Sequence, residues 1–276
     1  MKRELDLVII SDTHLGTYGC HARELGNYLK SIRPRILVLN GDILDIWQGR
    51  LAHFPPEHVR VVRRILKMAA EGTRVYYLTG NHDDALRRYT DFSAGNVHLR
   101  DKLVLQLHGQ RYWIFHGDVF DLSIRYSRWL ARLGGLGYDW LIRLNRWVNR
   151  WRQRMGKPRM SFAERLKYRI KEAVRFVHDF EATAIRLAAE KGYDYVVCGH
   201  IHRPLIRREE IDGRTVTYMN AGDWVENLTA LECKGGRWRL FRYDEAAFDG
   251  LHPHLRIAEA APEIPTGEAL VRRVMG

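Results

Sequence analysis

The fold is decided first by the stretch LDLVIISDTH, residues 5–14. Its apolar, branched residues predict a buried β-strand over Leu5–Ile10. The strand ends just before Asp12 and His14, whose side chains are common metal ligands. A buried strand that ends in this way delivers its ligands to one edge of a sheet.

The same arrangement returns four more times along the chain. Each of the apolar runs ILVL, VYYL, YWIF and YVV is followed closely by a short polar block. The four blocks are Gly41-Asp42, Gly80-Asn81-His82-Asp83, His116-Gly117-Asp118 and Gly199-His200-Ile201-His202. Five strands that each end in such a polar block predict one composite site.

Helical segments alternate with strands in the first third of the chain. The pattern predicts a helix over His21–Arg33 that stops before Pro34, because a residue that precedes proline avoids helical geometry. A second strand over Ile36–Leu39, a helix opened by Pro55-Pro56 and a strand over Arg74–Leu78 follow. This alternation predicts a mostly parallel sheet covered by helices.

The second half of the chain reads as helix and then mainly strand. The pattern predicts a hairpin over Leu103–Phe115 with its turn at Gly109-Gln110, and one long helix or two joined helices over Ala163–Glu190. Strands are predicted over Tyr193–Cys198, Leu205–Ile211, Thr215–Met219, Leu228–Glu232 and Trp238–Tyr243. An Asp212-Gly213 turn joins two of these strands and is a strong hairpin signal.

The ligand types indicate which ions the composite site would hold. Oxygen and nitrogen donors without thiolate suit Mn²⁺, Fe²⁺, Zn²⁺ or Mg²⁺. A carboxylate has two oxygens, and Asp42, which stands alone after a glycine, is the predicted bridge between two ions. Two ions about 3.5–4 Å apart can clamp a phosphoryl group and activate a water that attacks phosphorus.

The five blocks together resemble the calcineurin-like metallophosphoesterase signature. The order D-x-H, G-D, G-N-H-D, H-G-D, G-H-x-H runs from Asp12 to His202. The resemblance implies an α/β fold, an αββα sandwich of two facing mixed β-sheets flanked by helices. It also implies an enzyme that hydrolyses phosphate esters or anhydrides.

The same resemblance assigns the site residues. It implies that one metal ion is bound by Asp12, His14, Asp42 and His202, and the other by Asp42, Asn81, His116 and His200. His82 would contact the phosphate as a catalytic residue, and Asp83 would support His82. Asp45, Trp47 and Asn220 stand near the blocks and are further candidates to line the site.

One branch of the family is especially similar in its His116-Gly117-Asp118 block, its GHIHRP block (residues 199–204) and its Arg- and Trp-rich insertion. That branch splits the pyrophosphate bond of UDP-2,3-diacylglucosamine, in lipid A biosynthesis, into UMP and a diacylglucosamine phosphate. The branch implies two divalent ions, Mn²⁺ foremost. It usually has arginine where this chain has His82, which favours the alternative of a phosphodiesterase or phosphatase acting on soluble nucleotides or other phosphate esters.

The chain is expected to form one domain over residues 1–250, with a helical insertion over about 119–178 as a lid and a tail over 251–276. The net charge is +12, and the segment Val119–His178 holds 15 Lys and Arg against 4 Asp and Glu. Within it, a Trp face lies beside an Arg face at helical spacing: Trp140, Leu144, Trp147 and Trp151, then Arg143, Arg146, Arg150 and Arg154. These faces suit an anionic membrane surface, and ordinary packing against the core stays open.

Several classes of protein are disfavoured. No apolar run reaches the roughly 18 residues of a membrane span, and no signal-peptide pattern precedes Leu5, so we expect a cytoplasmic protein with peripheral contact at the inner membrane. Cys20, Cys198 and Cys233 form no CxxC pair, which argues against a disulfide framework and against zinc-thiolate chemistry.

Two further hypotheses remain from different classes. A pI of about 9.8 with interleaved Arg and Trp suggests a nucleic-acid binder, but the basic cluster is confined to one segment and we expect no specific nucleic-acid partner. A non-enzymatic scaffold of the same fold ranks last, because such proteins usually lose ligands and all candidate ligands are present here.

Overall fold

The computed structural model describes residues 2–46, 54–120 and 177–248. The chain divides into two compact units, Met1–Tyr243 and Asp244–Gly276. Of the second unit, only residues 244–248 are described, and they contain the short helix α5 (Glu245–Phe248). None of the described helices is both long enough and apolar enough to cross a membrane.

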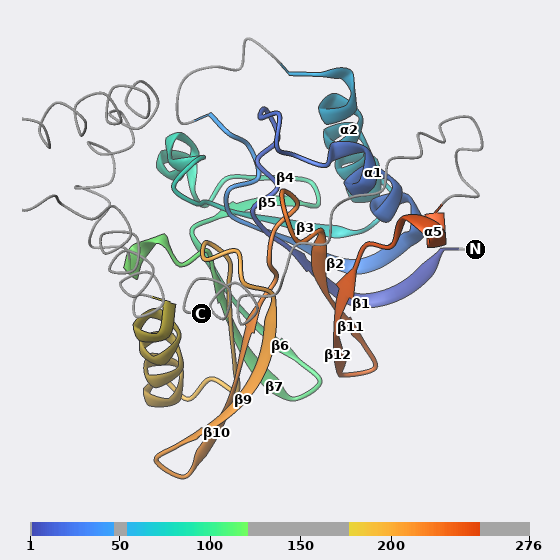
Figure 1. Ribbon diagram of the computed structural model, residues 1–276. Helices are drawn as coiled ribbons and strands as arrows, with labels where there is room; N and C mark the ends of the chain where they lie inside the picture. The colour runs from blue at the N-terminus through green and yellow to red at the C-terminus, as the bar shows by residue number, and fades with distance from the viewer. Residues whose placement is uncertain (1, 47–53, 121–176, 249–276) are drawn as a thin grey trace, which may run out of the picture. The chain divides into compact units, whose positions relative to one another are not determined.

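The larger of two sheets in the first unit has seven strands (Figure 1). Their order across the sheet is β12 (Arg237–Arg242), β11 (Thr229–Lys234), β1 (Arg3–Ile10), β2 (Ile32–Asn40), β3 (Arg74–Leu78), β5 (Val97–Arg100) and β4 (Ser93–Ala94). The neighbours among β1, β2, β3 and β5 pair in parallel, whereas β11 is antiparallel to β1. This sheet is therefore mixed with a parallel centre.

The second sheet has five strands. Their order is β6 (Lys102–Leu107), β7 (Gln110–Phe115), β8 (Tyr195–Cys198), β10 (Arg214–Asn220) and β9 (Leu205–Ile211). β8 lies parallel to both β7 and β10, and the outer pairs are antiparallel hairpins. Two 3₁₀ turns, η1 (Asp84–Tyr89) and η2 (Asp118–Phe120), follow the strands β3 and β7.

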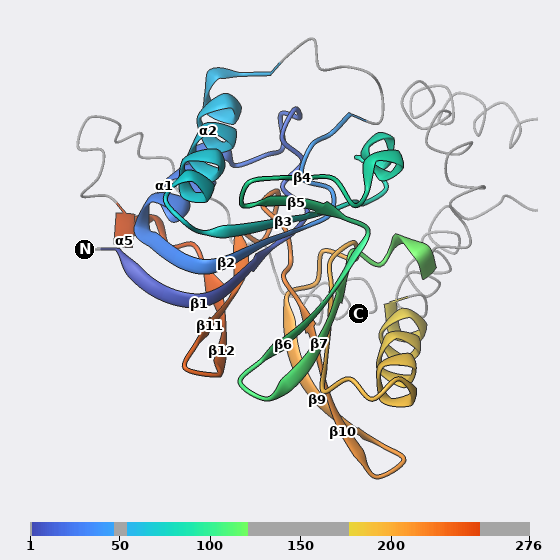
Figure 2. The ribbon, with the colours of Figure 1, turned by 180° about the vertical axis from the view of Figure 1, so that it is seen from behind.

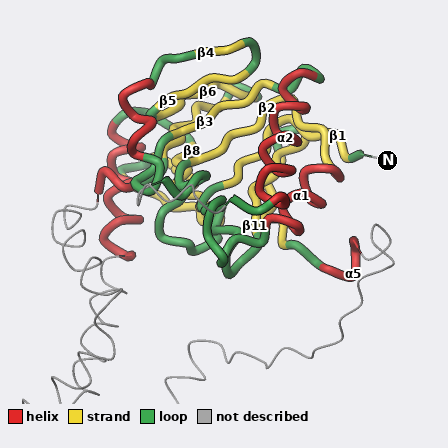
Figure 3. Tube along the Cα trace, turned by 90° about the horizontal axis from the view of Figure 1, so that it is seen from above, coloured by secondary structure: helices red, strands yellow, loops and turns green. Residues whose placement is uncertain are grey.

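Three hydrophobic clusters define the layers. The helices α1 (Ala22–Ser31) and α2 (Pro56–Ala70) pack on the outer face of the seven-stranded sheet, as Figures 2 and 3 show. A middle cluster, which includes Leu7 and Val197, joins the two sheets, and the helix of residues 177–190 packs on the outer face of the five-stranded sheet. The layers confirm the predicted αββα sandwich.

Some predicted boundaries were wrong. The first helix ends at Ser31 rather than Arg33, and β2 already begins at Ile32, because Ile32 and Arg33 pair with Arg3 and Glu4 of β1. The turn between β6 and β7 falls on His108-Gly109 rather than Gly109-Gln110, and both residues have a positive φ. The strands β4 and β5 were not predicted.

Other predictions fall on residues outside the described ranges. They include Trp47, the Trp and Arg faces between residues 140 and 154, the helix before residue 177 and the tail over 251–276. The division into a domain over 1–250, an insertion and a tail stays a prediction.

Candidate metal centre

The polar blocks meet at one edge of the two sheets. Asp12, Asp42 and Asn81 follow β1, β2 and β3, which run in parallel. His116 and His200 follow the parallel strands β7 and β8 of the other sheet. Because parallel strands end at the same edge, side chains far apart in sequence come together there.

The first group of ligand-type side chains is Asp12, His14 and His202. Their donor atoms lie within 4.8 Å of one another. Nε2 of His202 is 3.2 Å from Oδ1 of Asp12, and the rings of His14 and His202 are 5.5 Å apart between centroids. The spacing is close enough for one ion to be shared by all three.

The second group is Asp42, His116 and His200, whose donor atoms also lie within 4.8 Å of one another. Nε2 of His116 is 3.3 Å from Oδ2 of Asp42. The backbone N–H of His200 donates to Oδ2 of Asp12 at 3.1 Å, which ties this group to the first. These two groups are adjacent at this edge, and a third candidate group, His14, Asp45 and His82, shares His14 with the first.

The histidine at the centre of the second group is held in one orientation. Nδ1 of His116 lies 3.0 Å from the backbone carbonyl of Asn40, to which it would donate its proton. When the ring is neutral, that hydrogen bond leaves the lone pair on Nε2, on the side of Asp42, where it could bind a cation. A backbone acceptor behind a ligating imidazole commonly fixes its tautomer in this way.

The backbone at the site is strained. Five of the predicted ligands have positive φ angles although none is glycine: Asp12 (51°), His14 (47°), Asp42 (53°), His200 (67°) and His202 (50°). Such conformations cost on the order of 1–3 kcal/mol each and are typically retained at functional sites. The strain turns successive side chains toward one point.

The donor atoms fit a cation. Oδ1 of Asp12, Oδ1 of Asn81 and Nε2 of His116 are buried and have no hydrogen-bond partner among the described residues. Burial alone lowers the pKa of His116, but the carboxylates of Asp42 and Asp12 outweigh it and hold that pKa well above its usual range. So much buried negative charge demands a positive partner, which a divalent ion supplies.

His82 and Asp83 lie at the same edge but have different neighbours. Nδ1 of His82 is 3.5 Å from Oδ1 of Asp45, and its ring is 4.6 Å from that of His14. Asp83 is buried and accepts hydrogen bonds from the backbone of Gly80 and Ile43 and from the hydroxyl of Tyr77. The carboxylate beside the His82 ring is thus Asp45, while Asp83 braces the loops.

Two further residues lie against the block Gly199–His202. Asn220 donates from Nδ2 to the carbonyl of Gly199 at 2.8 Å. Asp223, which the sequence analysis missed, is buried, and its Oδ2 lies 3.9 Å from Nδ1 of His202. The block Ala221-Gly222-Asp223 follows the strand β10, so the strand-end signal used for the other blocks would have found it.

Glycine at position 80 is a steric requirement of the site. A Cβ at Gly80 would overlap Oδ1 of Asp42 and come within 2.8 Å of the His116 ring. Gly80→Ala is therefore expected to lower kcat about 100-fold, because a displacement of about 1 Å costs that much. The matched control is Gly26→Ala in α1, where the new methyl meets only Val61 at 3.9 Å. Equal activity of both variants would contradict the tight packing.

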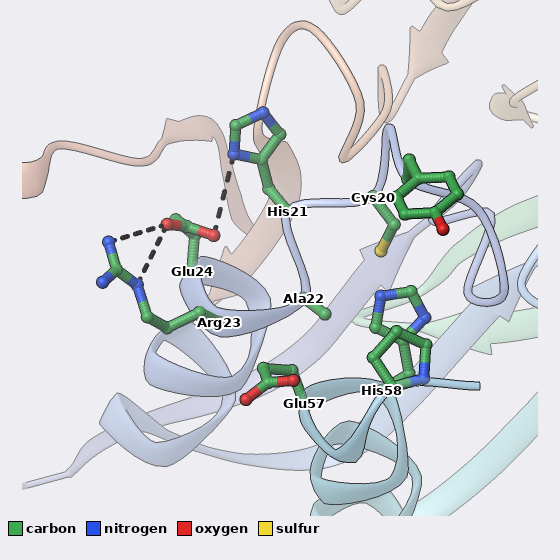
Figure 4. Close-up of a pocket in the computed structure, with 9 residues that line it drawn as sticks. Cys20, His21, Ala22, Arg23, Glu24, Glu57 and His58 are labelled. Atoms are coloured by element: carbon green, nitrogen blue, oxygen red, sulfur yellow. Dashed lines mark hydrogen bonds and ion pairs between the residues drawn. The ribbon is translucent and has the colours of Figure 1, made fainter. Parts of the chain in front are cut away.

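A cavity of about 260 Å³ opens beside the loop that follows His14 (Figure 4). Its lining includes Cys20, His21 and His58, and none of the seven predicted metal ligands. Nδ1 of the buried His58 accepts the backbone N–H of Gly16 at 2.8 Å. The start of α2 thereby holds the ligand-bearing loop in place.

This geometry agrees with the comparisons with known proteins. The chain belongs to the calcineurin-like phosphoesterase family, whose family model matches residues 5–204. It is accordingly a hydrolase of phosphoesters or pyrophosphates, in a family that uses divalent metal ions.

Named relatives cover most of the chain. It is 26% identical over 247 residues to a UDP-2,3-diacylglucosamine hydrolase of Aeromonas salmonicida, which covers 86% of this chain and 92% of the relative. It is 28% identical over 239 residues to the same-named protein of Azotobacter vinelandii, with 84% and 96% covered. A solved archaeal phosphodiesterase shares 12% identity with a TM-score of 0.37, over 86% of this chain and 98% of that one.

Proposed function

We propose that this protein hydrolyses the pyrophosphate bond of UDP-2,3-diacylglucosamine to UMP and 2,3-diacylglucosamine 1-phosphate. The observation that carries the proposal is the pair of adjacent ligand groups at one sheet edge, in a chain whose relatives bear that substrate in their names. A pyrophosphate presents several anionic oxygens, which suit a site built to hold two cations.

The residues that would hold two divalent ions are those of the two groups. Asp12, His14, Asp42 and His202 would bind one ion, and Asp42, Asn81, His116 and His200 the other. Bound ions, Mn²⁺ foremost, with Fe²⁺, Zn²⁺ or Mg²⁺ as alternatives, would supply charge neutralisation at phosphorus and an activated water. The position of the Asp42 carboxylate supports its proposed role as the bridge between the two ions. One of its oxygens faces His116, and the other accepts the backbone N–H of His82 at 2.8 Å.

His82 is the proposed catalytic group that contacts the phosphate. It is less enclosed than His116, with 26% of its side chain exposed, so that a substrate can reach it. Oδ1 of Asp45 lies 3.5 Å from Nδ1 of the ring and stabilises its protonated form, and a protonated imidazole can donate to a phosphoryl or leaving-group oxygen. Asp83 is proposed to act by holding Gly80 and Ile43 in place.

The Asp45 contact has a measurable consequence. Asp45→Asn is expected to lower kcat about 100-fold with little change in KM, because the ring loses its charged partner while the cation sites remain. Asp212→Asn, in the exposed β9–β10 turn, is the matched control and should retain wild-type kinetics. An unchanged kcat for Asp45→Asn would remove Asp45 from the mechanism.

The substrate is tested directly. Purified protein with Mn²⁺ should release UMP from UDP-2,3-diacylglucosamine in detergent, and chelation should abolish the release. The second candidate is hydrolysis of soluble nucleotides or other phosphate esters, which the histidine at position 82 favours. Faster turnover of such esters than of the lipid would select it, and absence of lipid turnover with every metal would reject the first proposal.

A peripheral position on the cytoplasmic face of the inner membrane completes the proposal. Its support is the excess of basic residues over Val119–His178. Retention of the protein on vesicles that contain anionic lipid, but not on neutral vesicles, is the expected result at low salt. Equal recovery from both kinds of vesicle would count against membrane contact.

A further inference from the structure

A second cluster of ligand-type side chains lies away from the five blocks. It consists of Asp6 on β1, His108 in the β6–β7 turn and Cys233 on β11, and their donor atoms lie within 4.8 Å of one another. Asp6 is six residues before Asp12, about 20 Å along an extended strand. Figures 1 and 2 show the β6–β7 and β11–β12 turns close to each other.

The contacts hold the cluster together. Nε2 of His108 lies 3.1 Å from Oδ2 of Asp6, and the same carboxylate oxygen accepts the backbone N–H of Gly235 at 2.6 Å. Gly236 packs against His108, since a Cβ built there would lie 3.7 Å from the ring. His108 has a φ of 50°, so the turn places the imidazole with a backbone geometry that is uncommon for histidine.

The third member is a buried thiol. The side chain of Cys233 has no exposed surface. Burial, and then the nearby Asp6 carboxylate, raise the pKa of its thiol to about 11.

We propose that Asp6, His108 and Cys233 bind a thiophilic divalent ion such as Zn²⁺, with the fourth position open. Carboxylate, imidazole and thiolate are the donors that Zn²⁺ prefers, and three of them around one point match a tetrahedral site with one external ligand. On binding, the Cys233 thiol gives its proton to the solvent, and its sulfur forms a bond with the ion.

A cavity of about 260 Å³ is lined by Asp6 and by Leu107, the neighbour of His108. Arg35 and Arg74 line the same cavity, so that an anionic fourth ligand such as chloride or hydroxide is favoured. Of the three cluster residues, Asp6 alone lines the cavity.

The position gives the ion a structural role. Asp6 and Cys233 belong to the seven-stranded sheet, whereas His108 belongs to the hairpin at the edge of the five-stranded sheet. An ion bound to all three ties the two sheets together far from the catalytic edge. Because the ligands converge only in the folded chain, binding stabilises the folded state.

Cobalt spectroscopy of the full chain separates this site from the catalytic one. Co²⁺ bound to a thiolate absorbs in the near ultraviolet, and the predicted catalytic ligands include no thiol. The wild-type protein is expected to show this band on titration with Co²⁺, and Zn²⁺ should displace it. Cys233→Ser should abolish the band and His108→Gly, which suits the positive φ, should weaken it strongly while hydrolytic activity is retained.

Two controls make the result decisive. Cys20→Ser and His178→Ala remove a thiol and an exposed histidine outside the cluster and should leave the band unchanged. A wild-type protein without the band, or a band that survives Cys233→Ser, would overturn the proposal and leave Asp6–His108 as a plain ion pair. Retained phosphoesterase activity in His108→Gly shows that the variant is folded. A wild-type protein that shows the band but hydrolyses no phosphoester would count against the proposed function alone.

Discussion

Asp42→Asn is expected to reduce kcat about 1000-fold, a loss of about 4 kcal/mol in transition-state stabilisation. Asparagine keeps the shape of the side chain and can still accept the backbone N–H of His82. It lacks the negative charge and the second equivalent oxygen that Asp42 directs toward His116. The substitution therefore removes the proposed bridging charge while the packing of the side chain is kept.

The measurement combines steady-state kinetics with metal analysis of the same preparation. The variant should bind fewer divalent ions per chain than the wild type, because one carboxylate serves both proposed sites. Asp91→Asn, at an exposed position that also has a positive φ, is the control and should match the wild type in both measurements. Full metal content together with full activity in Asp42→Asn would refute the bridge.

Trp224→Ala is expected to lower the free energy of unfolding by about 3–5 kcal/mol. Trp224 is completely buried, with its ring 5.4 Å from that of Tyr28 on α1, so its removal opens a large cavity in the main core. The backbone N–H of Trp224 also donates to the carbonyl of Asp12 at 3.1 Å. Relaxation of this loop should shift Asp12 and reduce activity as well.

Trp224→Phe is the matched variant. Phenylalanine fills most of the cavity, and it removes an indole N–H that is buried without a hydrogen-bond partner among the described residues. Its loss of stability should therefore be well below that of Trp224→Ala in urea unfolding monitored by circular dichroism. Equal losses for the two variants would show that the cavity is not the cause.

Most of the candidate metal centre could be predicted because the sequence pattern that marks it is local. A buried strand followed by Asp, Asn or His is visible in a few residues, and parallel pairing then brings Asp12, Asp42 and Asn81 to one place. The pairing of His82 with Asp45 depends on how two loops approach each other, so the sequence analysis could hold Asp45 only as a candidate. Asp223 had the local signal, after the strand β10, and was overlooked.

The sequence by itself predicted the αββα class and the phosphoesterase chemistry, because its five polar blocks resemble the family signature. Strand periodicity and the residue types at strand ends marked the candidate ligands. Only the tertiary structure decided which side chains face one another. The three cysteines argued against zinc-thiolate chemistry because none forms a local pair. Folding nevertheless brings Cys233 to Asp6 and His108, which lie 227 and 125 positions away in the chain. Contacts between distant segments depend on how the two sheets stack, and no local pattern encodes that stacking.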